Sequence, residues 1–138
     1  MRMWMVYPII MCWNHLNGEH AEHHMFCGTI KKGISIEGYL NNNLLEPSSL
    51  FQRHEELAQE MYRRKSKVHN SPFPLTQEEI KEFMTERQYN TKINKYNSLV
   101  RLLEICPNCR ERALWFFLTM QNNNNHVIVN NLSQTLLN

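Results

Sequence analysis

Residues 46–67 read EPSSLFQRHEELAQEMYRRKSK, and this stretch decides the fold class because its pattern is helical. Pro47 suits the first turn of a helix, where the amide hydrogen that proline lacks would be unpaired in any case. Four side chains then recur at spacings of four, three and four residues, as on one face of a helix: Leu50, His54, Leu57 and Met61. We therefore predict a helix that begins at about Pro47 and buries this face, His54 included.

Four further segments are predicted to be helical. Their approximate bounds are 13–26, with Pro8 as an earlier possible start, then 76–88, 91–105 and 110–120. Gly28 is the predicted stop of the first of these helices. Thr76 and Glu79 form a capping box that starts the second. In the segment 91–105, the residues predicted to face the core are Tyr96, Leu99, Val100 and Leu103.

The stretches between these helices carry weaker signals. Residues 1–7 are mostly apolar and rich in strand-forming types, so we predict an extended N-terminal segment. Residues 28–46 have the composition of a loop, with room for one short strand at Ile34–Ile36. Residues 122–138 are polar and Asn-rich, and only Val127–Val129 would suit a strand there.

Length and composition agree with one globular domain. The chain has 138 residues, of which 42% are hydrophobic and 20% charged, and these values exclude wholesale disorder. We therefore predict a mainly α fold, a compact single-domain bundle of about four helices with irregular loops over residues 1–121, followed by an Asn-rich tail at 122–138. The formal net charge of +2 neither demands nor excludes a nucleic-acid partner.

The amino end of the chain bears on where the protein acts. Arg2 precedes an apolar stretch, as in a secretory signal, but Pro8 interrupts it and Trp13 stands where small cleavage-site residues belong. No apolar run approaches the roughly 18–20 residues that a membrane span needs. We therefore expect an intracellular protein that is not secreted and has no membrane partner.

The first predicted helix carries a constellation of titratable residues. His15, Glu19 and Glu22 lie at i, i+4 and i+7, so an imidazole and two carboxylates share one helix face. Carboxylates packed close to each other and to an imidazole can have raised pKa values, which suits general acid or base catalysis. The alternative interpretation is a polar helix face exposed to solvent.

Two helical segments resemble the pyrimidine-dimer DNA glycosylase family, the phage-type repair enzymes also called endonuclease V. Asn14-His15-Leu16, followed by Glu19 and Glu22, is similar to the family's Gln-His-Leu, then Glu, then the catalytic Glu three residues later. Residues 53–64 resemble its Arg-x-x-Glu-Leu-x-x-Glu helix, which ends in basic residues. The resemblance covers roughly residues 1–70.

This resemblance implies a DNA glycosylase with an associated AP lyase step and no cofactor. The α-amine of Met1 would attack C1′ of the damaged nucleotide and form a Schiff base, and Glu22 would assist ring opening and strand cleavage. An α-amine has a reference pKa of about 7.7–8.0, so part of it is unprotonated near neutral pH. Since Arg2 is not small, we expect the initiator Met1 to be retained. The residues that would contact DNA around the sugar are Arg2, Asn14, His15 and Glu19.

A basic cluster follows the second helix of the resemblance. Its members are Arg63, Arg64, Lys65 and Lys67. Such a cluster can bind phosphates, and double-stranded damaged DNA is the predicted partner of a chain expected to be monomeric. The alternative is a solvated helix end, where positive charge is favoured by the helix dipole.

The four cysteines offer a competing interpretation. Cys106-Pro-Asn-Cys109 would supply half of a tetrahedral zinc site, and His20 with His24, or Cys27, would supply the rest. We predict instead two reduced cysteines at a helix junction and no metal. The alternative function is a non-enzymatic or zinc-stabilised protein that binds nucleic acid or has a structural role, built on Cys106, Cys109 and the His-rich elements.

Overall fold

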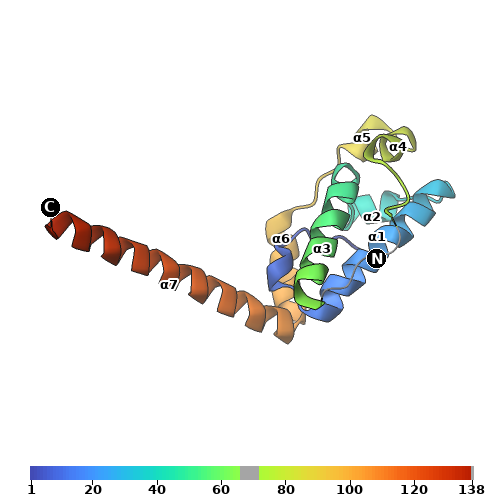
Figure 1. Ribbon diagram of the computed structural model, residues 1–138. Coiled ribbons are helices and arrows are strands. Elements are labelled where there is room, and N and C mark those ends of the chain that lie inside the picture. The colour runs from blue at the N-terminus through green and yellow to red at the C-terminus, as the bar shows by residue number, and fades with distance from the viewer. Residues whose placement is uncertain (66–71, 138) are drawn as a thin grey trace.

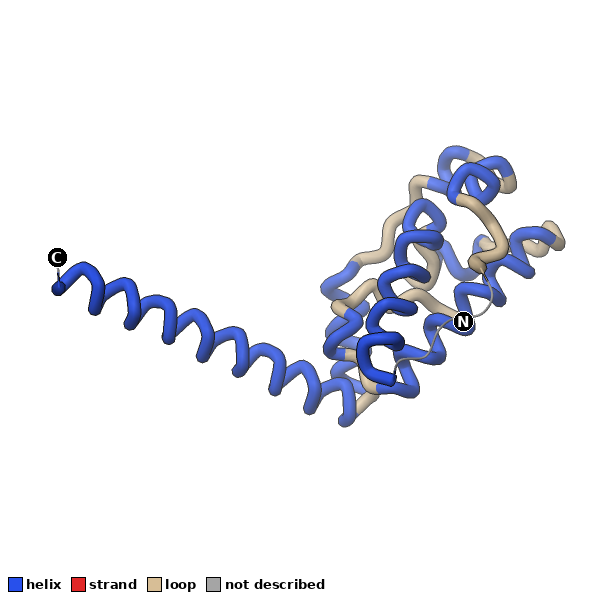
Figure 2. The backbone as a smooth tube through the Cα atoms, viewed as in Figure 1, coloured by secondary structure: helices blue, strands red, loops and turns tan. Residues whose placement is uncertain are grey.

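The computed structural model describes the backbone of residues 1–65 and 72–137, and the side chains of residues 1–65 and 72–123. Within this part every regular element is a helix, which confirms the mainly α prediction (Figures 1 and 2). Four helices are long: α1 (Trp13–Lys31), α3 (Leu50–Lys65), α6 (Lys95–Ile105) and α7 (Pro107–Leu137). The short elements are α2 (Glu37–Asn41), α4 (Gln77–Glu82), α5 (Glu86–Tyr89) and the 3-10 turns η1 (Pro8–Ile10) and η2 (Pro47–Ser49).

Helices α1 and α3 pack side by side and run in opposite directions (Figure 1). Lys65, at the end of α3, lies over the ring of Trp13, at the start of α1. The predicted face of α3 is buried, and His54 is only 2% exposed. This outcome follows from periodicity, because apolar side chains one helical turn apart have to be covered together.

Helix α1 continues five residues beyond its predicted end. Gly28 lies inside the helix, and the stop is Gly33, whose φ of +68° suits a residue without a side chain. The amide of Ile34 donates to the carbonyl of Thr29 (3.2 Å) and that of Gly33 to Ile30 (3.1 Å), which together form a Schellman motif. The predicted strand at 34–36 is wrong, because these residues lead directly into α2.

The predicted helix 76–88 is divided in two. The capping box of Thr76 and Glu79 is confirmed at the start of α4. Thr85 and Gln88 form a second capping box that starts α5, and this signal in the sequence was missed. A capping residue needs an extended backbone, so Thr85 cannot continue the preceding helix.

The carboxyl-terminal helices differ most from the prediction. In α6 the fully buried residues are Ser98 and Leu102, whereas Tyr96 is 74% exposed and Val100 is 36% exposed. Helix α7 is continuous from Pro107 to Leu137, so the strand considered at 127–129 is wrong. Figure 1 shows α7 extending away from the other helices, across the predicted boundary between domain and tail.

The N-terminal segment, residues 1–7, precedes the first helical element, but the predicted extended backbone is interrupted at Met5, whose φ is +56°. The segment joins the two apolar clusters of the core. Met3 packs with the second half of α1, α2 and α4, while Trp4 packs with the first half of α1, α3 and the α6–α7 junction. The amide of Met3 donates to the carbonyl of Leu44 (2.8 Å). No helix in the described ranges is both long and apolar enough to cross a membrane.

The orientation of α6 can be tested with one pair of variants. Leu102→Ala removes a fully buried side chain and is expected to lower the free energy of unfolding by about 2–5 kcal/mol. Val100→Ala removes a partly exposed side chain on the face predicted from sequence, and should cost less than about 1 kcal/mol. Urea denaturation measures both, and the reverse order would contradict the described packing.

Candidate active site

The N-terminal segment lies along the face of α1 that carries the predicted catalytic residues. The amide of Arg2 donates to Glu22 Oε2 (2.9 Å), and the amide of Trp4 donates to Glu19 Oε1 (2.9 Å). The ring of Trp4 meets the ring of His15 edge-on, with centroids 5.7 Å apart. The segment therefore runs from Glu22 toward the start of α1. The amides of Arg2 and Trp4 donate to two carboxylates on one face of this helix.

Glu22 and the amino terminus are brought together by this arrangement. Because Glu22 accepts from the amide of Arg2, its carboxylate lies one peptide unit from the α-amine of Met1. Both Met1 and Glu22 are half-buried, so each retains access to solvent. A primary amine beside a carboxylate can attack an electrophilic carbon while the carboxylate transfers protons.

The guanidinium of Arg2 is positioned beside this pair. It lies 3.6 Å from the centroid of the Trp4 ring, and its Nη2 donates to Ser98 Oγ (3.1 Å). Burial lowers the pKa of Arg2 from its ordinary value, and the charge of Arg101 adds to this effect. Among the described residues no carboxylate lies within 4.0 Å of the Arg2 guanidinium, although the charges of Glu19 and Glu22 raise its pKa in opposition to burial.

Glu19 takes part in a buried ion pair. Arg53 donates from Nε to Glu19 Oε2 (2.6 Å) and from Nη2 to Oε1 (3.0 Å), and its Nη1 donates to the carbonyl of Val6 (2.6 Å). Glu19 is 2% exposed and Arg53 is 3% exposed. The predicted DNA contact of Glu19 therefore has almost no surface available, and its observed partners are in the protein interior.

His23 lies beneath this ion pair and is fully buried. Its Nδ1 is 2.8 Å from the carbonyl oxygen of Glu19. Burial lowers the pKa of His23 to about 3, and the nearby charge of Arg53 acts in the same direction. The imidazole is therefore neutral over the whole physiological pH range.

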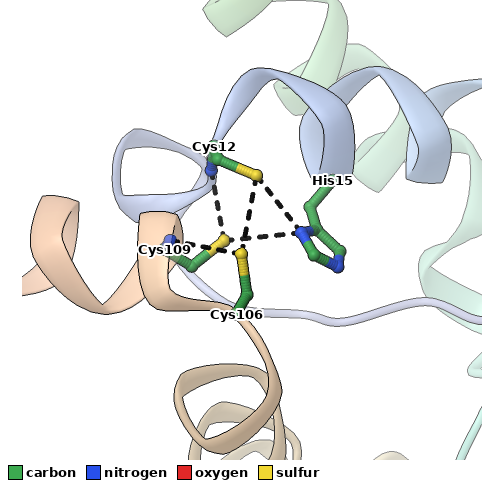
Figure 3. A group of neighbouring side chains, drawn as sticks. All are labelled: Cys12, His15, Cys106 and Cys109. Atoms are coloured by element: carbon green, nitrogen blue, oxygen red, sulfur yellow. Dashed lines mark hydrogen bonds between the residues drawn. The ribbon is translucent and has the colours of Figure 1, made fainter.

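His15 and Asn14 lie at the start of α1, about two turns from Glu22. Asn14 is exposed. The Nδ1 of His15 is 3.2 Å from Cys12 Sγ and 3.7 Å from Cys109 Sγ, so its polar neighbours are thiols (Figure 3). We refer to Cys12, His15, Cys106 and Cys109 as the thiol–imidazole group.

The zinc ligands considered from the sequence are not the ones that the fold brings together. Cys106 and Cys109 lie beside Cys12 and His15, whereas His20 and His24 form a separate group with His54 on α3. The Nε2 atoms of His24 and His54 are 3.0 Å apart, and the rings of His20 and His54 are stacked. The missed signal was Cys12-x-x-His15, which has the same two-residue spacing as Cys106-x-x-Cys109.

The basic cluster at the end of α3 is engaged in contacts within the protein. Arg63 and Arg64 both donate to the carboxylate of Glu60, which holds the pKa of Glu60 below its ordinary value despite partial burial. Arg64 also donates to the carbonyl of Pro8 (2.9 Å). Lys65 is exposed, with its Nζ 3.8 Å from the Trp13 ring centroid. Lys67 lies outside the described residues.

Comparison with known proteins identifies one match. The family model described as pyrimidine dimer DNA glycosylase matches residues 1–73, which is just over half of the chain. No curated protein and no solved structure matches this chain. The matched range contains the N-terminal segment, α1 and α3, and therefore Met1, Glu22 and the Glu19–Arg53 pair.

The Glu19–Arg53 pair can be tested by removing one partner. Arg53→Met leaves a buried carboxylate without its cation and should lower the free energy of unfolding by about 3–5 kcal/mol. The double variant Glu19→Gln, Arg53→Met should recover part of this loss, since no uncompensated charge remains. As a control, Arg87→Met breaks an exposed ion pair with Glu37 and should lower the free energy of unfolding far less than Arg53→Met does. Equal losses for Arg53→Met and Arg87→Met in urea denaturation would contradict the assignment.

The buried neutral His23 predicts a pH dependence. Its pKa is about 3 in the folded protein, against an ordinary value of 6.5. Below pH 6.5 the unfolded chain takes up a proton that the folded chain does not, so stability falls as the pH is lowered. The expected loss between pH 7.5 and pH 5 is about 2 kcal/mol. His23→Asn retains an amide donor and does not titrate, so its free energy of unfolding should not show this loss of about 2 kcal/mol on acidification. If the variant and the unaltered protein had the same pH profile of stability, the prediction would be refuted.

Proposed function

Because the chain belongs to the pyrimidine dimer DNA glycosylase family, we propose that it breaks the glycosidic bond of a pyrimidine at UV-induced dimers in duplex DNA and then nicks the strand. The nucleophile is the α-amine of Met1, and the acid–base group is Glu22. The single observation that supports this most strongly is the hydrogen bond from the Arg2 amide to the Glu22 carboxylate, which joins the start of the chain to the middle of α1.

The first step is displacement of the base. The unprotonated amine of Met1 attacks C1′, forming a nitrogen–carbon bond as the bond from C1′ to the base nitrogen breaks and its electron pair leaves with the base. The sugar ring then opens at the C1′–O4′ bond, O4′ gains a proton, and the amine loses one to give a Schiff base. We assign these proton transfers to Glu22, because its carboxylate accepts from the Arg2 amide, next to the amine in the chain.

The second step is strand cleavage. The iminium group withdraws electrons from C2′, so the Glu22 carboxylate can remove a proton there. The C3′–oxygen bond then breaks, and its electron pair leaves with the 3′ phosphate. One carboxylate can serve both steps because the Schiff base holds the sugar on the residue beside it.

DNA binding relies on residues around this pair. Arg2 is the best placed for a phosphate, since its guanidinium is partly desolvated and forms no ion pair within the described ranges. Asn14 and Lys65 are exposed near the start of α1 and can contact the backbone farther along the duplex. A target base inside a duplex has to be unstacked first, and this costs less where the base is already damaged.

Trapping with borohydride tests the chemistry directly. Protein that begins at Met1 is mixed with an irradiated duplex or an abasic duplex, with sodium borohydride in half of the reactions. We expect nicking without borohydride and a covalent protein–DNA adduct with it, because borohydride reduces an imine to a stable amine. Peptide mapping should place the adduct on Met1.

Two altered proteins and one control complete this experiment. A chain extended before Met1 should form no adduct, because its α-amine no longer lies beside Glu22. Glu22→Gln should slow nicking by a factor of about 10²–10⁴, the usual contribution of a general acid or base. Glu104→Gln, at an exposed position on α6, should nick at the normal rate. If DNA is bound but the unaltered protein gives neither nick nor adduct, the enzymatic proposal fails and the non-enzymatic alternative takes its place.

A further inference from the structure

The thiol–imidazole group joins two segments that are far apart in the sequence. Cys12 and His15 lie at the start of α1, and Cys106 and Cys109 lie at the junction of α6 and α7 (Figure 3). The three sulfur atoms and the His15 ring nitrogen all lie within 4.8 Å of one another. The three cysteines are buried and none is in a disulfide. The catalytic proposal uses none of the three thiols.

We propose that these four residues bind a structural zinc ion. Tetrahedral zinc with Zn–S bonds of about 2.3 Å and a Zn–N bond of about 2.0–2.1 Å places neighbouring ligand atoms roughly 3.6–3.8 Å apart. Cys12 Sγ and Cys106 Sγ are 3.8 Å apart, and Cys109 Sγ and His15 Nδ1 are 3.7 Å apart. Cys12 Sγ and His15 Nδ1, at 3.2 Å, need to move apart by a few tenths of an ångström.

The type and number of ligands favour zinc in a structural role. Three thiolates and one imidazole form a complete tetrahedral set, which leaves no position for a reactive water. The two-residue spacing within each pair is the usual spacing of zinc-binding cysteines and lets one turn of chain supply two ligands. The carboxylate and carbonyl oxygens that Mg²⁺ or Ca²⁺ would require are missing from this set.

The surrounding backbone stabilises negative charge on the sulfur atoms. The amide of Cys12 donates to Cys109 Sγ (3.2 Å), and the amide of Cys109 donates to Cys106 Sγ (3.4 Å). The amino ends of α1 and α7 lie at this group together with the carboxyl end of α6, so the favourable contacts here are the two donated amides. Such hydrogen bonds to ligating sulfur are a common feature around zinc ions.

A disulfide accounts for the group less well. The Cys12 and Cys106 sulfur atoms are too far apart for a bond of about 2.05 Å, and a bond between them would leave Cys109 and His15 without a function. The zinc proposal uses all four residues. It also explains how the chain beyond residue 73 is attached to α1, since two ligands lie within the range of the family match and two lie outside it.

Metal analysis and cobalt spectroscopy of the unaltered protein test the site without any variant. Protein purified in the presence of zinc is expected to contain about one zinc per chain by mass spectrometry. Exchange with Co²⁺ should give the visible absorption of a tetrahedral ion and a thiolate-to-metal charge-transfer band whose intensity corresponds to three thiolates. A folded protein that takes up neither metal, or a disulfide found by intact mass, would overturn the proposal.

Matched variants assign the ligands. Cys109→Ser and Cys106→Ser should lose the bound zinc and the charge-transfer band. Cys27→Ser changes another buried cysteine outside the group and should retain both. His24→Gln changes the separate histidine group and should also retain both. Retention of zinc in Cys109→Ser together with its loss in His24→Gln would place the metal on His20, His24 and His54 and refute the proposed site.

Discussion

The buried carboxylate of Glu19 on α1 joins this helix to α3 and to the N-terminal segment, and the rest of the structure depends on these contacts. Arg53 reaches it from α3 with two nitrogen donors, and the N-terminal segment reaches it with the amide of Trp4. Removing two charges from water costs several kcal/mol per ion, and this is offset only when geometry and hydrogen bonding are good. Here both carboxylate oxygens are occupied, and Arg53 also binds the carbonyl of Val6. The position of residues 1–6 relative to α1 is thus fixed by polar contacts that tolerate little displacement.

Much of this fold could be predicted because local patterns determine it. The periodicity of α3 and the capping box at Thr76 act over a few residues, so they are visible in the sequence. Contacts between residues that are far apart in the chain cannot be recognised from the sequence in this way. Glu19 and Arg53 were both noticed, but nothing in the sequence indicates that each is the other's buried partner. Likewise the pair Cys106–Cys109 was noticed without Cys12 and His15, because only the packing of α7 beside η1 brings the two pairs together.

The carboxyl-terminal half of the chain contacts the N-terminal segment of the candidate site, although the family match ends at residue 73. Ser98 on α6 accepts from the Arg2 guanidinium and donates to the carbonyl of Trp4. Arg112 on α7 donates twice to the carbonyl of Ile9, just before α1 begins. The N-terminal segment is therefore held between α1 on one side and α6 and α7 on the other. A truncated chain that ended with the family match would lack the Ser98 hydroxyl that accepts from the Arg2 guanidinium.

Three residues on one face of α1 differ in role, and the extent to which each is buried distinguishes these roles. Glu19, in the middle of the face, is 2% exposed and is fully paired, so it supports the fold. Glu22, one turn later, is half-buried and holds the amide of Arg2 next to the proposed nucleophile. His15, one turn earlier, meets the thiols and also packs against Trp4. Because Trp4 and Arg2 belong to one short segment, an ion bound at His15 would restrain the same segment that positions the amine beside Glu22. In this arrangement a zinc ion at the thiol–imidazole group would be linked to the proposed reaction centre through the Trp4 ring and residues 1–4.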